Sequence, residues 1–309
     1  MHPDQMQLHF NPESLTLLNV ILGLVMFGVA LDLHIRDFKR LFLAPKGPLI
    51  GLTAQFLLLP MFTYLLIRII EPMPSLALGM ILVAACPGGN VSNFITHLAG
   101  GNTALSVTMT AISTTLALVM TPFNLTFWGS LYPPTAELLT QVQLDPVQVF
   151  FTIVMILGIP LAAGMSLRHY APKIAARLRR PFKIASIGVF VLFIAIAFMM
   201  NFDNFQTFIV HVFYIVFLHN ATALLLGFWS SRLLGMPHRD ARAVSIEVGI
   251  QNSGLGLVLI FDFFHGLGGM ALVAAWWGIW HLVAGLSLAT YWSRKPAAAP
   301  ALSRIETTS

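Results

Sequence analysis

Apolar runs of about 20 residues recur along the whole chain, and each can cross the hydrocarbon core of a bilayer as a helix. Only 9% of the residues are charged, whereas a soluble domain carries roughly 25%. The sequence therefore predicts an all-α polytopic membrane protein. We expect about nine transmembrane helices, at residues 15–33, 46–70, 74–98, 101–126, 146–168, 182–200, 207–231, 239–263 and 268–292.

The polar stretches between and beside these runs are short. Residues 1–14 lack a basic region followed by a cleavable apolar segment, so we expect no signal peptide. No long polar insertion divides residues 15–292, which are predicted to form a single transmembrane domain followed by a tail at 293–309.

The basic residues predict the orientation. If the runs alternate in direction, only Arg68 of the 17 Lys and Arg residues lies on the outer side. Loop 127–145 on that side carries acids and no base. The rest lie in loops 34–46, 168–183 and 232–242 and in the tail. By the positive-inside rule, we expect a multi-pass protein of the cell (inner or plasma) membrane, with an extracytoplasmic N-terminus and a cytoplasmic C-terminus. Because the basic loops report topology, nucleic-acid binding is not expected.

Two of the predicted helices are interrupted by polar residues and glycine. The third contains "ACPGGNVSN" at 85–93, and the eighth contains "EVGIQNSG" at 247–254. These helices run in opposite directions and occupy matching places if helices one to four and six to nine are inverted repeats. Paired interrupted helices of this kind indicate a secondary transporter with a midplane site. A simple kink, satisfied by neighbouring helices, is the alternative for the first break.

Oxygen-bearing side chains gather near these breaks. Glu247 is the one carboxylate in the middle of a predicted span, where a charge without a partner costs at least about 2.5–3.5 kcal/mol. No Lys or Arg lies in the middle of a predicted span to pair with it, so a bound cation or a proton is the expected counter-charge. Ser106, Thr110 and Ser113 share one helix face, and Gln55 stands alone in an apolar run. Oxygen ligands suit hard cations such as sodium, although hydroxyls also serve helix packing.

The segments "CPGGNVSNFITHLAGGNTALSVTMTAIST" and "SIEVGIQNSGL" resemble the bile acid:sodium symporter family. The resemblance runs roughly from Leu17 to Trp292. It implies a core domain made of the spans within 46–126 and 207–292. This domain would contain two discontinuous helices that cross. It also implies a panel domain, at spans 15–33, 146–168 and 182–200. Bacterial members often have ten spans, so this chain is expected to start at what would be the second.

The resemblance also implies ligands, which are carried over where residues match. The first sodium site would consist of Ser92, Asn93, Ser106, Thr110 and Glu247. The second would consist of Gln55, Glu247, the carbonyls of Val248 and Ile250, and Gln251. The substrate region would include Asn90, Asn252 and His281. Leu282 stands where some bacterial relatives have asparagine, so the substrate itself does not carry over.

The expected function is sodium-coupled symport of an organic anion, either bile-acid-like or a small carboxylate, by alternating access. Two sodium ions would be co-transported, and the lipid bilayer would be a further partner. Proton coupling through Glu247 is an alternative, and a channel or membrane receptor is another. No nucleophile–base pair or metal cluster stands out in the sequence, so we do not expect an enzyme.

Overall fold

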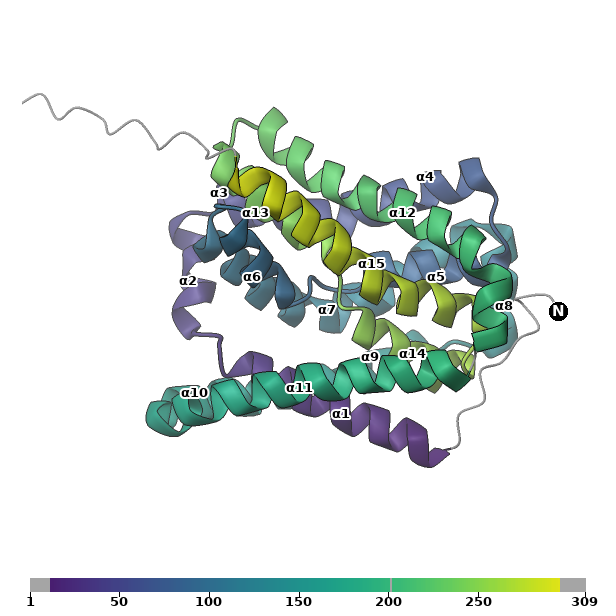
Figure 1. The fold of residues 1–309 in the computed structure, drawn as a ribbon, viewed down its shortest axis with the longest axis horizontal. Coiled ribbons are helices and arrows are strands. Elements are labelled where there is room, and N and C mark those ends of the chain that lie inside the picture. The colour runs from purple at the N-terminus through teal and green to yellow at the C-terminus, as the bar shows by residue number, and fades with distance from the viewer. Residues whose placement is uncertain (1–11, 201, 295–309) are drawn as a thin grey trace, which may run out of the picture.

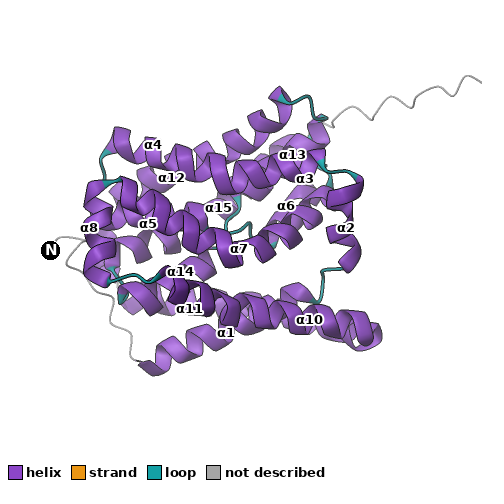
Figure 2. Ribbon diagram, turned by 180° about the vertical axis from the view of Figure 1, so that it is seen from behind, coloured by secondary structure: helices purple, strands orange, loops and turns teal. Residues whose placement is uncertain are grey.

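The computed structural model describes residues 12–200 and 202–294. The described chain is helical, with loops and turns between the helices (Figures 1 and 2). The first half contains α1 (Pro12–Ala30), α2 (Ile35–Leu43), α3 (Lys46–Thr53), α4 (Leu59–Ile70), α5 (Pro74–Ala85), α6 (Val91–Leu98), α7 (Thr103–Leu131) and α8 (Pro133–Val142). The second contains α9 (Pro146–Ile153), α10 (Ile159–Tyr170), α11 (Pro172–Met200), α12 (Phe202–Leu233), α13 (His238–Gly249), α14 (Ser253–Phe264) and α15 (Gly268–Ser293). Most of the predicted terminal segments 1–14 and 293–309 lies outside the described residues.

The long apolar helices confirm an all-α polytopic membrane protein. Among the described residues, five helical stretches are long and apolar enough to cross a membrane: Lys46–Ile70, Thr103–Leu131, Pro146–Tyr170, Val212–Leu233 and Gly268–Ser293. Helices α5 and α14 are apolar but shorter, because each is one half of an interrupted span. The total of nine membrane crossings stays a prediction.

Local sequence explains where several helices begin and end. Proline occupies the first turn of α5, α8 and α9, where its missing N–H breaks no helical hydrogen bond. Asn102 caps α7 by accepting from the N–H of Leu105, and Asp145 caps α9 by accepting from that of Val147. Glu71, Gln143 and His265 end α4, α8 and α14 in the left-handed conformation.

Two predicted loops are largely helical, so these loop predictions are wrong. Helix α2 occupies loop 34–46, and α7 and α8 extend through most of loop 127–145. Helix α2 is short and amphipathic, with the sequence IRDFKRLFL, so no long apolar run marks it. The predicted loop 168–183 is reduced to Ala171 between α10 and α11, because the basic start of α11 continues its helix beyond the apolar part.

The helices divide into two packed groups. Helices α1, α10 and α11 contact one another and lie together along one side of the molecule in both views (Figures 1 and 2). On the other side, α5 packs on α7 and α15, and α12 packs on α13 and α15. Helix α2 connects the two groups, because it follows α1 and also contacts α7.

The interrupted helices lie at the centre of the second group, which includes α5, α7, α12, α13 and α15. All residues from Ser75 to Ala85 on α5 and from Ala241 to Gly249 on α13 are buried. Non-helical backbone at membrane depth is stable only where protein surrounds it or it lines a cavity. The burial of both breaks therefore meets the condition for two discontinuous helices inside a membrane domain.

Candidate functional site

The breaks between α5 and α6 and between α13 and α14 cross and pair through their backbones. Gly88 and Gln251 form an isolated antiparallel bridge. The N–H of Gly89 donates to the carbonyl of Ile250 at 2.6 Å, and the N–H of Asn252 donates to that of Pro87 at 2.9 Å. The crossing predicted from the two sequence motifs is thus present, and each break supplies partners to the other.

The two glycines of the first break leave little space for a side chain at this crossing. A Cβ atom at Gly88 would lie 2.3 Å from Oε1 of Glu247, and one at Gly89 would lie 3.2 Å from the carbonyl oxygen of Gln251. The first distance is too short for a non-bonded carbon–oxygen contact, so the carboxylate would have to move. Gly88 therefore lets the backbone of the first break approach the carboxylate carried by the second.

Side chains from other helices satisfy the carbonyls that the end of α5 leaves free. The helical partner of Ala85 would be the N–H of Gly89, which instead pairs with Ile250. The hydroxyl of Thr121 donates to the Ala85 carbonyl at 2.8 Å. The amide of Gln55 donates to the Cys86 carbonyl at 2.9 Å. Side chains from α7 and from the segment between α3 and α4 therefore hold the broken end of α5.

The end of α13 is satisfied in the same way. The amide of Gln251 donates to the Val248 carbonyl at 2.6 Å, and that of Asn220 donates to the Gly249 carbonyl at 2.7 Å. Sequence reasoning missed Thr121 and did not assign Asn220 to the breaks. The sequence signal for both residues was a polar side chain in the middle of an apolar run. This signal does not identify the carbonyl to which the side chain donates.

A further freed carbonyl, that of Phe56, lies next to Gln55 in the sequence. Residues Ala54–Leu58 form a π-helical turn between α3 and α4, a feature found frequently at functional sites. Pro60 has no N–H to donate to the Phe56 carbonyl four residues earlier, and the amide of Asn124 donates to that carbonyl at 3.0 Å. Asn124 on α7 thus stabilises the irregular turn that carries Gln55.

The carboxylate of Glu247 lies among hydroxyl groups from α6 and α7. Ser92 donates to Oε2 at 2.6 Å, and Thr110 donates to Oε1 at 2.8 Å and to Oε2 at 3.0 Å. Ser106 lies 3.3 Å from Oε2. All four side chains are buried. The structure therefore gathers residues from three helices around one buried carboxyl group.

Asn93 completes this cluster and Ser113 does not join it. The Oδ1 atom of Asn93 accepts from Ser106 at 2.8 Å and from Thr110 at 3.3 Å. The hydroxyl of Ser113 instead donates to the Thr110 carbonyl of its own helix at 3.2 Å. The residues expected for a first sodium site thus lie together, and Ser113 has the local bonding of a helix-packing hydroxyl.

The residues expected for a second sodium site adjoin the crossing. The side-chain amides of Gln55 and Gln251 pair with each other, at 2.8 and 3.2 Å. The carbonyls of Val248 and Ile250 accept hydrogen bonds from Gln251 and Gly89. Each of these carbonyls therefore already accepts one hydrogen bond and has a second lone pair.

The residues expected to contact substrate differ in exposure. Asn90 precedes α6 and is exposed. Asn252 caps α14 by accepting from the N–H of Leu255 at 3.1 Å, and its amide lies 3.7 Å from the sulfur of Met26 on α1. His281 is buried on α15, one turn before Gly285, where an added Cβ would lie 2.9 Å from Ile250 and 3.1 Å from Ile95.

Arginine does not neutralise Glu247 from the same helix. Arg242 is the basic residue of α13 closest to Glu247 in sequence, and it donates to the carbonyls of Ala99 at 2.8 Å and of Trp292 at 3.2 Å. Its guanidinium group also lies over the ring of Trp292. Arg242 therefore holds the start of α13 against the ends of α6 and α15.

These features define a class of polytopic helical membrane protein, in which two discontinuous helices cross around a buried polar site. Sequence comparison then identifies the family. The model of the Sodium Bile acid symporter family matches residues 19–208, and the chain belongs to this family.

Similar proteins include bacterial, plant and animal transporters. The chain is 36% identical to the uncharacterized sodium-dependent transporter YocS of Bacillus subtilis, over 90% of this chain and 83% of that protein. It is 31% identical to the probable chloroplastic sodium/metabolite cotransporter BASS1 of Arabidopsis thaliana, over 88% of this chain and 66% of that protein. It is 28% identical to the human ileal sodium/bile acid cotransporter, over 78% of this chain and 67% of that protein. These names support sodium-dependent transport as the general activity of the family.

Proposed function

We propose that this protein is a sodium-coupled symporter of an organic anion that works by alternating access. The observation that carries the proposal is the buried carboxylate of Glu247, on one broken helix, bonded by Ser92 on the other and by Thr110 on α7. A buried carboxylate is stable only with a compensating charge or proton. The surrounding groups favour a sodium ion in that role.

The chemistry of these groups suits a hard cation. A serine or threonine hydroxyl has one proton to donate and two lone pairs. When Ser92, Ser106 and Thr110 direct their protons to Glu247, their oxygens keep lone pairs for a cation. Oxygen ligands of this kind suit small hard cations, and the carboxylate would balance the charge of one sodium ion.

We place a second sodium ion at Gln55, Gln251 and the carbonyls of Val248 and Ile250, with Glu247 shared between the sites. In the structure, these carbonyls accept hydrogen bonds from Gln251 and Gly89. A bound sodium ion would take the place of these hydrogen-bond donors. Binding would then reorganise the crossing, which gives sodium a direct effect on the conformation of both broken helices.

The anion would bind on the opposite side of the crossing, where Asn90 and Asn252 precede α6 and α14. The start of a helix carries partial positive charge and free N–H groups, which favour a carboxylate or sulfonate. Asn252 and Met26 approach across the boundary between the core helices and α1. A substrate there would contact both groups of helices, so their relative motion would change its exposure.

Two sodium ions moving with a monoanion would carry one net positive charge. With the proposed cytoplasmic C-terminus and an inside-negative plasma membrane, this charge would contribute about 2.3 kcal/mol per 100 mV to uptake. Transport would then be electrogenic.

Uptake into proteoliposomes tests the proposal. Labelled taurocholate serves as a large sulfonate probe and labelled pantoate as a small carboxylate probe. The uptake of each is measured with and without an imposed sodium gradient. We expect saturable, sodium-driven accumulation of at least one probe, lost in Glu247→Gln. Accumulation driven by a proton gradient without sodium would point instead to proton coupling through Glu247, and flux without accumulation would point to a channel.

A further inference from the structure

A second polar site lies at the junction of α1, α2 and α10, where none of the expected ion or substrate ligands contributes. A pocket of about 250 Å³ opens there between the α1–α2 turn and the end of α10. Its polar lining consists of Arg36, Arg168, His34 and His169, and the remaining lining is apolar. Among the described residues, the lining contains no carboxylate, so the pocket is basic.

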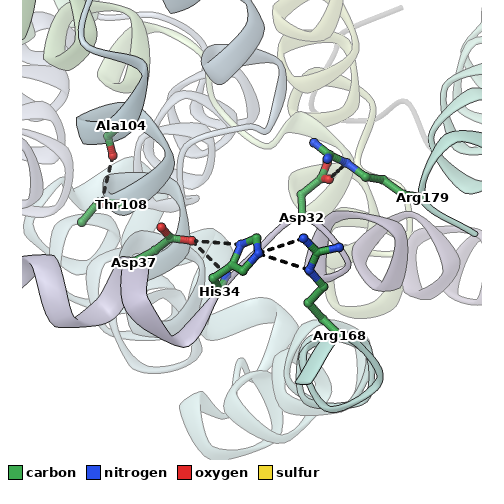
Figure 3. A network of polar contacts seen from close by, with 7 residues as sticks. All are labelled: Asp32, His34, Asp37, Ala104, Thr108, Arg168 and Arg179. Atoms are coloured by element: carbon green, nitrogen blue, oxygen red, sulfur yellow. Dashed lines mark hydrogen bonds and ion pairs between the residues drawn. The ribbon is translucent and has the colours of Figure 1, made fainter. Parts of the chain in front are cut away.

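Hydrogen bonds fix the geometry of this lining. The guanidinium group of Arg168 approaches Nε2 of His34, with Nη2 at 2.8 Å and Nε at 3.2 Å. His34 also donates its backbone N–H to Asp37 at 2.9 Å. Figure 3 shows Arg168 reaching from α10 to the histidine, while Asp32 pairs with Arg179 at the side.

The contact between Arg168 and His34 does not neutralise the arginine. Nε2 can accept from a guanidinium group only if the imidazole is neutral. Burial, and then the charges of Arg168 and Arg36, lower the pKa of His34 below its ordinary value. The positive charge of Arg168 therefore stays in the pocket beside that of Arg36, and the other guanidinium N–H groups can serve an anion.

The position of α2 indicates the source of that anion. The axes of α1 (over Asn19–Ala30) and α2 differ by 72°, so the chain bends sharply at the pocket. Phe42 and Leu43 on α2 are 82% and 83% exposed, on the same short helix as the exposed Arg36 and Lys39. Exposed large apolar side chains interleaved with basic ones are typical of a helix lying in the headgroup region of a bilayer.

We propose that this pocket binds the phosphate of an anionic phospholipid. Arg36 and Arg168 provide the charge, His169 adds a ring nitrogen, and the apolar lining lies against the start of the acyl chains. Basic pockets between transmembrane helices bind phosphate headgroups in this way. Helix α2 connects the group formed by α1, α10 and α11 to the core. The lipid would therefore contact both this connecting helix and α10.

Lipid retention by the full-length protein tests this site. Delipidated protein in neutral detergent is titrated with dioleoyl phosphatidylglycerol, and bound lipid is measured by native mass spectrometry beside the melting temperature. The double variant Arg36→Gln/Arg168→Gln is compared with Lys173→Gln/Arg177→Gln, which removes the same charge from exposed positions of α11 outside the pocket. We expect the pocket variant to bind the lipid roughly tenfold more weakly, and the α11 variant to bind as the unaltered protein does.

Equal lipid retention in the two double variants would overturn the proposal. Arg36→Gln alone keeps the test valid if loss of the Arg168–His34 contact prevents folding, and we expect it to weaken binding severalfold. Phosphatidylcholine and inorganic phosphate are the comparison ligands. Equal stabilisation by phosphatidylcholine would refute selectivity for an anionic headgroup. Equal stabilisation by millimolar inorganic phosphate, in competition with the lipid, would refute the lipid as the occupant.

Discussion

The hydroxyl of Ser92 donates to Oε2 of Glu247 at 2.6 Å, across 155 positions of the sequence. Ser92 belongs to the second half of one broken helix and Glu247 to the first half of the other. A sodium ion bound between them would therefore contact both broken helices directly. In the proposed function, such an ion would change the crossing itself and would not only add charge beside it.

Replacing the carboxylate should separate sodium coupling from folding. Glu247→Gln retains the shape and one acceptor oxygen but removes the negative charge. Loss of a full charge at contact distance should raise the half-saturating sodium concentration on the order of a hundredfold or more. Sodium-dependent uptake and ²²Na⁺ binding check this. Unchanged sodium dependence in a folded variant would refute the role of Glu247.

Two serines on α7 offer a matched comparison. Ser106 contacts Glu247 and Asn93, whereas Ser113 donates to the carbonyl of its own helix. Ser106→Ala should raise the half-saturating sodium concentration about tenfold, as expected for loss of a bond to a charged group. Ser113→Ala should change it less than twofold. Similar effects in the two variants would contradict a specific role for Ser106.

Substitution of a crowded glycine, Gly88, can be compared with substitution of an uncrowded one, Gly256. A Cβ at Gly88 would meet Oε1 of Glu247 at 2.3 Å, whereas one at Gly256 would meet its nearest neighbours at 3.8 and 3.9 Å. Gly88→Ala should reduce sodium-driven uptake more than tenfold, because the carboxylate must move. Gly256→Ala should keep uptake and the melting temperature unchanged or slightly raise the latter. Normal uptake by Gly88→Ala would show that the close approach is unimportant.

The Asn124 amide should stabilise the protein through the Phe56 carbonyl. Asn124→Leu removes the donor at 3.0 Å and should cost about 0.6–1.7 kcal/mol in a membrane, seen as a lower melting temperature in detergent. Pro60→Ala restores an N–H near that carbonyl. The double variant should therefore lose less stability than the two single losses combined, and simple additivity would argue against the assignment.

His34 should make stability depend on pH. Its pKa is lowered in the folded protein, chiefly by burial, so the unfolded chain binds a proton first as the pH falls. Stability should be unaffected above the ordinary histidine pKa of about 6.5 and should decrease below it. His34→Gln should make the fall in melting temperature between pH 7.5 and 5 shallower. His97→Gln, at an exposed position on α6, is the control for loss of a histidine.

Much of the architecture was readable from residue patterns. The apolar runs predicted a polytopic helical protein because a bilayer demands long apolar helices with internally satisfied backbones. The breaks at Gly88–Gly89 and around Ile250 were also visible, because proline, glycine and amides are costly in such runs. Together with the family resemblance, these positions led to Glu247 and its hydroxyl neighbours.

The predictions failed where local patterns were weak. The sequence predicts loops where α2 and α8 form, since an apolar window does not detect short amphipathic or mixed helices. Thr121 and Asn124 were missed, since each serves a carbonyl on another helix. The basic residues of the loops predicted the orientation of the chain. They did not predict that Arg168 would contact His34.

The sequence by itself determined the membrane class, the two interruptions and the chemical types available at the site, because composition and spacing fix how a chain partitions into lipid. Only the tertiary structure decided which donor meets which freed carbonyl, and that Ser113 donates to a carbonyl of its own helix. It also decided that Arg36 and Arg168 face one pocket. These outcomes depend on how helices distant in sequence pack, and pairwise distances of a few ångströms across helices leave no periodic pattern in a single chain.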